Sequence, residues 1–163
     1  MKTYNILFLC THNSARSILG EAVATTTSNG KFIGFSAGSH PSNAINPIAK
    51  KLAIELGYDE KKLFSKSWDV YAEKNAPQMD FVITVCDNAA NEVCPVWAGH
   101  PATAHWGFAD PSSVIGTDEE KLNAFKNVML GLTKRVQLLA SLPIDKLDHL
   151  SLTNKLKEIH KSN

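Results

Sequence analysis

The sequence lacks three features that would assign it to a common class of protein. It has only three cysteines, Cys10, Cys86 and Cys94, and an odd number does not suit the disulfide framework of a small secreted domain. Its apolar runs are far shorter than the roughly 20 residues that cross a membrane, and no signal-like stretch follows its first residues. Its 17 basic and 16 acidic residues leave a net charge of +1, without the basic stripe typical of nucleic-acid binding. We therefore expect a cytoplasmic protein that binds neither nucleic acid nor a membrane.

Segments with strand signals and segments with helix signals alternate along the chain. Short apolar runs predict strands at residues 5–10, 31–37, 80–86 and 102–106. Apolar residues at helical spacing predict helices between them, and a long amphipathic helix is expected from Glu119 to near Pro143. Asn46 and Pro47 supply a cap and a first helical residue for another helix, which Gly57 ends. This alternation predicts an α/β protein, a single-domain three-layer fold whose mostly parallel sheet binds ligands beyond the carboxyl ends of its strands.

The densest group of reactive residues follows the first predicted strand. Cys10 and Arg16 lie there in a C-x5-R-S pattern, which also arises when a cysteine merely closes a buried strand and an arginine caps surface charge. The backbone N–H groups of residues 11–16 are expected to converge on one anion at the positive end of a helix dipole, and the Arg16 guanidinium to bind two of its oxygens. The same field favours the thiolate of Cys10, a nucleophile to whose sulfur Ser17 is placed to donate a hydrogen bond. The candidate oxyanion-binding residues are therefore Thr11, His12, Asn13, Ser14, Ala15, Arg16 and Ser17.

This segment resembles the oxyanion loop of a known family. Residues 6–17, Ile-Leu-Phe-Leu-Cys-Thr-His-Asn-Ser-Ala-Arg-Ser, are similar to the phosphate loop of low-molecular-weight protein tyrosine phosphatases and of the arsenate reductases built on that fold. Further matches extend the resemblance over about residues 4–140, at 35–39, 82–87, 94–95 and 105–111. The resemblance implies a four-stranded parallel sheet with flavodoxin-like winding. It also implies a phosphatase-like arsenate reductase domain at residues 1–142, with residues 143–163 as a C-terminal helical appendage of the same domain.

Two further cysteines and an Asp-Pro pair distinguish the two branches of this family. Hydrolysis of phosphate needs one thiolate, whereas reduction of arsenate needs two electrons, which thiols supply by forming a disulfide. The resemblance implies that Cys10 forms an adduct with arsenate, that Cys86 attacks the Cys10 sulfur as arsenite leaves, and that Cys94 then pairs with Cys86. Asp110, followed by Pro111 in a setting similar to the reductases, would donate the proton with which oxygen leaves as water. The expected function is the reduction of arsenate to arsenite in arsenic detoxification, and the alternative is a phosphatase that hydrolyses aryl phosphates through a Cys10 phosphocysteine.

The resemblance also implies an external thiol reductant and no tightly bound cofactor. Thioredoxin-coupled reductases of this fold separate the second and third cysteines by six residues, whereas seven residues separate Cys86 from Cys94. The expected electron donor is therefore either thioredoxin or glutathione with glutaredoxin. In some of these reductases a potassium ion lies beneath the loop, and the positions that resemble its ligands are Asn13, Glu21, Ser36, Ser67 and Asp69.

Two interpretations from other classes stay open. Cys86, Cys94, His100 and His105 would be the ligands of a zinc site, although structural zinc cysteines are usually about two to four residues apart. A zinc site also gives Cys10 and Arg16 no role. The other interpretation is a sensor that binds arsenicals or responds to redox change without catalysis. Stoichiometric zinc in the purified protein would support the zinc site, and turnover of arsenate would exclude both interpretations.

Overall fold

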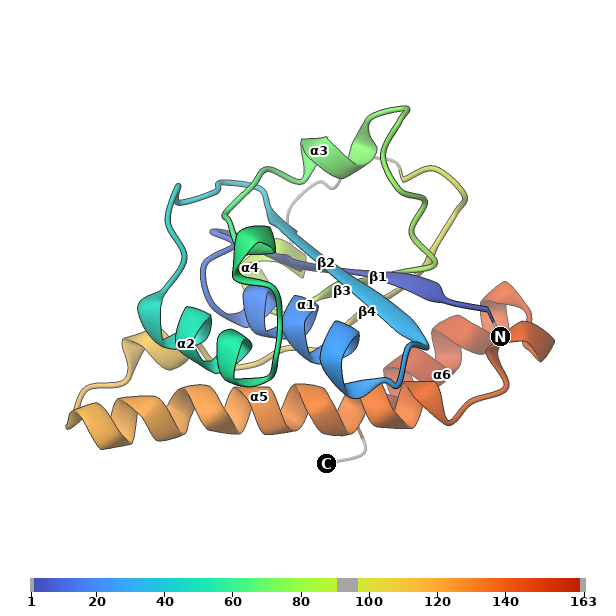
Figure 1. Cartoon of the computed structure of the whole chain (residues 1–163). Helices are drawn as coiled ribbons and strands as arrows, with labels where there is room; N and C mark the ends of the chain where they lie inside the picture. Colours follow the sequence, from blue (N-terminus) through green and yellow to red (C-terminus); the bar gives the residue numbers. More distant parts are fainter. Residues whose placement is uncertain (1, 91–96, 162–163) are drawn as a thin grey trace.

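A four-stranded parallel sheet forms the centre of the computed structural model, which describes residues 2–90 and 97–161 (Figure 1). Its strands are β1 (Tyr4–Cys10), β2 (Phe32–Gly38), β3 (Phe81–Thr84) and β4 (Ala102–His105), in the order β2-β1-β3-β4. All four predicted strands are present, with ends that differ from the prediction by one or two residues. The segments that follow β1 and β3 leave the sheet side by side, because these two strands pair with each other at its centre. In a sheet of this winding, that is the position where ligands bind.

Among the described residues, the longer helices agree with the predicted pattern apart from differences at their ends, whereas two four-residue helices, Asp69–Ala72 and Asp87–Ala90, were not predicted. The helices are α1 (Arg16–Thr27), α2 (Pro47–Glu55), α3 (Asp69–Ala72), α4 (Asp87–Ala90), α5 (Asp118–Ala140) and α6 (His149–Lys161), and short 3-10 turns lie at Glu60–Lys62, Pro111–Ser113 and Ile144–Lys146. Asn46 caps α2 as predicted, since its side chain accepts a hydrogen bond from the amide of Ile48 at 2.9 Å. The long helix α5 starts one residue earlier than expected because Thr117 and Glu120 form a reciprocal capping box. It ends at Ala140, three residues before Pro143.

Side chains from both faces of β1 are buried, as its continuous apolar sequence predicted. Ile6 and Phe8 belong to the larger core cluster, formed with α1, α5 and α6. Leu7 and Leu9 belong to a smaller cluster on the opposite face, where Trp68 and Tyr71 of the α3 region pack. Figure 1 shows α1, α2 and α5 on one side of the sheet and α3 on the other. The predicted three-layer α/β architecture is therefore confirmed.

The C-terminal helix α6 packs beside the edge strand β4. Leu156 is fully buried, and its backbone carbonyl accepts a hydrogen bond of 2.9 Å from the indole N–H of Trp106, which follows β4. Leu150, on the same helix, is 68% exposed. Ile144, Leu156 and Ile159 of this C-terminal region thus contribute to the main core. Within the described ranges, no helix has the length and apolar character needed to cross a membrane.

Candidate active site

The loop of residues 11–15 joins β1 to α1 and is held from outside by its carbonyl oxygens. Backbone amides of the segment 40–46 donate to these oxygens at 2.8–3.1 Å, in the pairs His40–Thr11, Ser42–His12 and Asn46–Ser14. The described residues contain no cis peptide bond, and in a trans peptide the N–H group points opposite to the C=O group. The N–H groups of residues 12, 13 and 15 are therefore directed away from the segment 40–46. This arrangement suits an oxyanion.

Two residues give the loop its tight shape. Gly38, at the end of β2, leaves no room for a side chain, since a Cβ atom there would lie 2.5 Å from the Thr11 carbonyl oxygen. Asn13 has a positive φ of 48° and is fully buried. Its side chain donates to Ser17 Oγ at 2.9 Å and accepts from the amide of Lys66 at 2.9 Å. The donation from Ser17 to Cys10 that the sequence predicted is not among the hydrogen bonds of the described residues, in which Ser17 Oγ accepts from Asn13.

The thiols of Cys10 and Cys86 are buried and lie beside each other at the carboxyl ends of β1 and β3. Cys86 follows β3 by two residues, and its sulfur accepts a hydrogen bond of 3.3 Å from the amide of Thr11. A hydrogen bond between the two thiols, together with burial, raises the pKa of Cys10 above its ordinary value, although the charge of Arg16 acts in the opposite direction. The same hydrogen bond lowers the pKa of Cys86, and the contacts with Thr11 lower it further. The lower pKa of the pair thus lies at Cys86, while the charge of Arg16 still favours the thiolate that the sequence predicts at Cys10.

Arg16 connects the loop to the segment that contains Asp110. One guanidinium nitrogen donates to the Phe108 carbonyl at 2.8 Å, and another lies 3.9 Å from an Asp110 carboxylate oxygen. Partial burial raises the pKa of Asp110, but the hydrogen bonds from Ser112 and the charge of Arg16 outweigh it, so that this pKa lies below its ordinary value. Asp110 is therefore a carboxylate at neutral pH. It can act as a proton donor only after a bound negative charge has raised its pKa.

The remaining predicted site residues differ in how they are placed. His12 is exposed, and one of its ring nitrogens lies 3.1 Å from the carbonyl oxygen of His40. Ser14 and Ala15 complete the loop, with Ala15 buried immediately before α1. Cys94 lies outside the described residues.

The proposed zinc ligands do not gather in the described part of the chain. The ring nitrogens of His105 lie 2.8 Å from Thr84 Oγ1 and 2.9 Å from an Asp87 carboxylate oxygen. Among the residues that the structure describes, no three His, Cys, Asp or Glu side chains come together in a way that would hold a metal ion. The zinc interpretation therefore has no support from this part of the molecule.

The residues expected to bind potassium are only partly brought together. Ser36 Oγ donates to a Glu21 carboxylate oxygen at 2.5 Å, so these two side chains do meet beneath the loop. The side chain of Asn13 is linked to Glu21 indirectly, since Asn13 Oδ1 accepts a hydrogen bond from the backbone amide of Lys66, whose Nζ lies near Glu21. Ser67 accepts a hydrogen bond from the amide of Asp69 at 3.2 Å, and Asp69 is exposed.

Sequence reasoning missed two residues that contact Glu21. The Tyr58 hydroxyl donates to one carboxylate oxygen, and Lys66 Nζ lies 3.7 Å from the other. Lys66 belongs to the polar run Ser65-Lys66-Ser67, in which no apolar periodicity marks a buried side chain. Tyr58 follows Gly57, the predicted end of a helix, and tyrosine is intermediate between the buried and the exposed residue types, so the sequence gives no local signal that it is buried.

The sequence matches the family described as low molecular weight phosphotyrosine protein phosphatase over residues 5–150. A protein of Halalkalibacterium halodurans named arsenate reductase is 35% identical over 135 residues, which cover 83% of this chain and 94% of that protein. A solved structure of an arsenate reductase in the phosphate binding state has a TM-score of 0.63 at 26% identity, with 85% of this chain and 98% of the other covered. The low molecular weight protein tyrosine phosphatase of T. tengcongensis has a TM-score of 0.64 at 21% identity, with 89% and 100% covered. The fold is common to both branches, and the chain belongs to the low molecular weight phosphotyrosine protein phosphatase family.

Proposed function

We propose that the protein reduces arsenate to arsenite and thereby serves arsenic detoxification. The observation that carries this proposal is the position of Cys86, whose buried thiol lies beside that of Cys10 and accepts a hydrogen bond from the first amide of the oxyanion loop. A phosphatase needs only the thiolate that attacks phosphorus, so a second thiol in contact with that nucleophile has no use in hydrolysis. In the reduction of arsenate, the second thiol supplies the second of the two electrons that arsenic takes up. Relatives that carry the name arsenate reductase over most of this chain support the same choice.

The first step forms a bond between sulfur and arsenic. Arsenate binds inside the loop, where the backbone N–H groups and the Arg16 guanidinium offset its charge. Cys10 Sγ attacks arsenic, one As–O bond breaks, and the oxygen leaves as water with a proton from Asp110. The proton that Cys10 releases balances the one that Asp110 donates, and Cys86 remains a thiolate throughout.

The second step transfers the electrons. The Cys86 thiolate attacks Cys10 Sγ, a disulfide forms between the two sulfurs, and the pair of electrons from the breaking As–S bond stays on arsenic. Arsenic is reduced from As(V) to As(III), two thiols are oxidised to one disulfide, and arsenite leaves after taking protons from water. The contact between the two thiols supports this step, because the attacking sulfur needs no large movement.

The electron donor completes the cycle. We propose that Cys94 attacks Cys86, releases Cys10 as a thiol and leaves a Cys86–Cys94 disulfide for thioredoxin. Glutathione with glutaredoxin is the other donor that the sequence allows, and it would not require Cys94. The two buried free thiols fit a reducing compartment such as the cytoplasm.

The decisive experiment measures arsenate-dependent oxidation of NADPH by the full chain in two separate mixtures. One contains thioredoxin and thioredoxin reductase, and the other contains glutathione, glutaredoxin and glutathione reductase. Oxidation that requires arsenate in either mixture supports the proposal and identifies the donor. Lack of oxidation in both mixtures, together with rapid hydrolysis of p-nitrophenyl phosphate, would instead establish the phosphatase.

A further inference from the structure

We propose that Lys66 positions the oxyanion loop by supplying the positive charge beneath it, so that the protein binds its oxyanion without a potassium ion. This inference rests on the proposed function only in taking the loop of residues 11–15 as the substrate site. Lys66 would act through Glu21 and Asn13, without touching the substrate.

The charge that requires a partner is the carboxylate of Glu21. Glu21 lies in α1, the helix that begins immediately after the loop, and its side chain is 4% exposed. Ser36 Oγ and the Tyr58 hydroxyl donate hydrogen bonds to its two oxygens, but neither group carries a positive charge. A buried carboxylate without a cation is strongly unfavourable, even when it is hydrogen-bonded.

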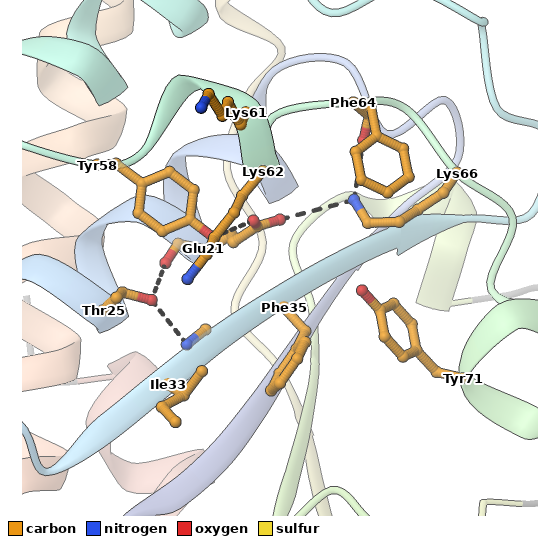
Figure 2. Close-up of a pocket in the computed structure, with 11 residues that line it drawn as sticks. Glu21, Thr25, Ile33, Phe35, Tyr58, Lys61, Lys62, Phe64, Lys66 and Tyr71 are labelled. Carbon is orange, nitrogen blue, oxygen red and sulfur yellow. Dashed lines mark hydrogen bonds and ion pairs between the residues drawn. The ribbon is translucent and has the colours of Figure 1, made fainter. Parts of the chain in front are cut away.

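The ammonium group of Lys66 meets this requirement. Its side chain is 6% exposed, and Nζ lies 3.7 Å from Glu21 Oε1 (Figure 2). Nζ also donates to the Phe64 carbonyl at 2.8 Å and lies 4.5 Å from the centre of the Phe64 ring, a favourable position for a cation. Burial lowers the pKa of Lys66, and the charge of Glu21 acts in the opposite direction.

The backbone of the same residue holds the loop. The Lys66 amide donates to Asn13 Oδ1 at 2.9 Å, and the Lys66 carbonyl accepts from the amide of Gly38 at 3.0 Å. Asn13 is the loop residue with a left-handed backbone, and Gly38 is the residue that lets β2 approach the loop closely. Any movement of Lys66 in response to the charge of Glu21 would therefore also move the loop, because the Lys66 backbone is hydrogen-bonded to both Asn13 and Gly38.

Potassium fits this site poorly. The ammonium group already occupies the side of Glu21 that a cation would approach, and a second positive charge there would be repelled. The Asp69 backbone amide donates to Ser67 Oγ, and neither side chain makes a described contact with Glu21. A pocket of about 290 Å³ lies over the carboxylate, with Glu21, Tyr58, Lys66 and Tyr71 in its walls (Figure 2). If the ammonium were removed, a small cation from solvent would have a path to Glu21.

The test compares phosphate binding by the wild-type chain and by Lys66→Met, a variant of similar length without charge. Isothermal titration calorimetry with inorganic phosphate is carried out in potassium chloride and in N-methylglucamine chloride at equal ionic strength. We expect the wild type to bind equally well in both salts. Lys66→Met should bind about tenfold more weakly in N-methylglucamine, and potassium should restore most of the affinity. Lys62→Met is the matched control, because Lys62 lines the same pocket but is exposed, and its affinity should not change in either salt.

The double variant Glu21→Gln/Lys66→Met separates a charge effect from a loss of packing. It removes both charges, so it should fold and bind phosphate equally in the two salts, even if Lys66→Met alone fails to fold without potassium. The proposal is overturned if wild-type binding depends on potassium, if Lys66→Met binds normally in N-methylglucamine, or if neither potassium nor Glu21→Gln restores the loss. These measurements use phosphate alone, so they remain decisive even if the protein fails to turn over arsenate.

Discussion

The two thiols at the carboxyl ends of β1 and β3 form a pair in which the pKa of each thiol depends on the other. Cys86 receives the amide of Thr11, while Cys10 faces the charge of Arg16, so the two sulfurs compete for one negative charge. In the described geometry the hydrogen bond from Cys10 stabilises a thiolate at Cys86. This arrangement prepares the sulfur that attacks in the second step.

Replacement of Cys86 by serine should therefore lower the pKa of Cys10. The hydrogen bond that raises the pKa of Cys10 in the wild type is replaced by a hydroxyl that can donate to a Cys10 thiolate, while Arg16 still lowers the pKa. A thiolate at Cys10 should then persist to lower pH than it does in the wild type. The rate of alkylation of Cys10 by iodoacetamide between pH 5 and 9, followed by peptide mass spectrometry, measures this shift. An alkylation profile that moved to higher pH would contradict the assignment of the charge to Cys86.

Cys10→Ser should abolish both arsenate reduction and any hydrolysis of aryl phosphates, since both reactions begin with the same sulfur nucleophile. Phosphate should still bind, because the loop amides and Arg16 supply that affinity. Coupled NADPH oxidation and calorimetry with phosphate measure the two properties separately. Turnover that survived in Cys10→Ser would exclude Cys10 as the nucleophile.

Asp110→Asn should lower turnover by about 10²–10⁴-fold, because the amide keeps the shape of the side chain but has no proton to donate. Phosphate affinity should not fall, since the 3.9 Å contact between Asp110 and Arg16 competes with an oxyanion rather than binding it. An unchanged rate would mean that another group donates the proton or that departure of oxygen does not limit turnover.

Ser112→Ala provides the complementary test by pH. The Ser112 hydroxyl donates to Asp110 at 2.7 Å and thereby lowers the pKa of Asp110. A group that acts in its protonated form loses activity as the pH rises through its pKa, so a higher pKa moves that loss to higher pH. Removing the hydroxyl should therefore shift the alkaline decline of kcat that is due to Asp110 toward higher pH, since kcat reports the groups in the substrate complex. No shift, or a shift toward lower pH, would count against Asp110 as the acid.

At the scale of elements, α6 contributes apolar packing to the fold far from the oxyanion loop. Leu156→Ala should lower the free energy of unfolding by about 2–5 kcal/mol, because this side chain is fully buried against the main core. Leu150→Ala on the same helix is the control, and a change within about 0.5 kcal/mol is expected since Leu150 is exposed. Chemical denaturation followed by circular dichroism and by tryptophan fluorescence measures both variants.

The same denaturation curves test whether residues 143–163 are an appendage of the first domain, as the sequence predicts. Trp106 donates to the backbone of α6, so its fluorescence, measured with Trp68 and Trp97 replaced by phenylalanine, reports the contact between β4 and this helix. Coincident transitions by both probes would support one cooperative domain. A separate early transition of helical signal would mean that α6 unfolds independently.

At the scale of the whole molecule, what the sequence predicted correctly depends on local patterns. The continuous apolar run of β1 and the cap at Asn46 are local signals, and both elements are present where they were expected. The C-x5-R-S pattern located the loop, because its shape depends largely on neighbouring residues. The contacts that bridge distant segments were not visible in this way. Glu21 meets Lys66 across 45 positions of sequence (66 − 21), and the Thr11 amide meets Cys86 across 75, so no local periodicity reports either contact.

The single hydrogen bond between Arg16 and the Phe108 carbonyl has a consequence for how the site forms during folding. It joins residues 92 positions apart, and the segment between them contains all of β2, β3 and β4. Contacts of such high sequence separation form late, because the entropy of closing a long chain segment opposes them until the intervening strands are paired. A nascent or partly folded chain can thus possess Cys10 and the helix that follows it, yet lack the guanidinium orientation that selects an oxyanion. Recovery of phosphate affinity during refolding therefore marks the completion of the sheet. The thiol of Cys10 is available to react before the site that selects its oxyanion has formed.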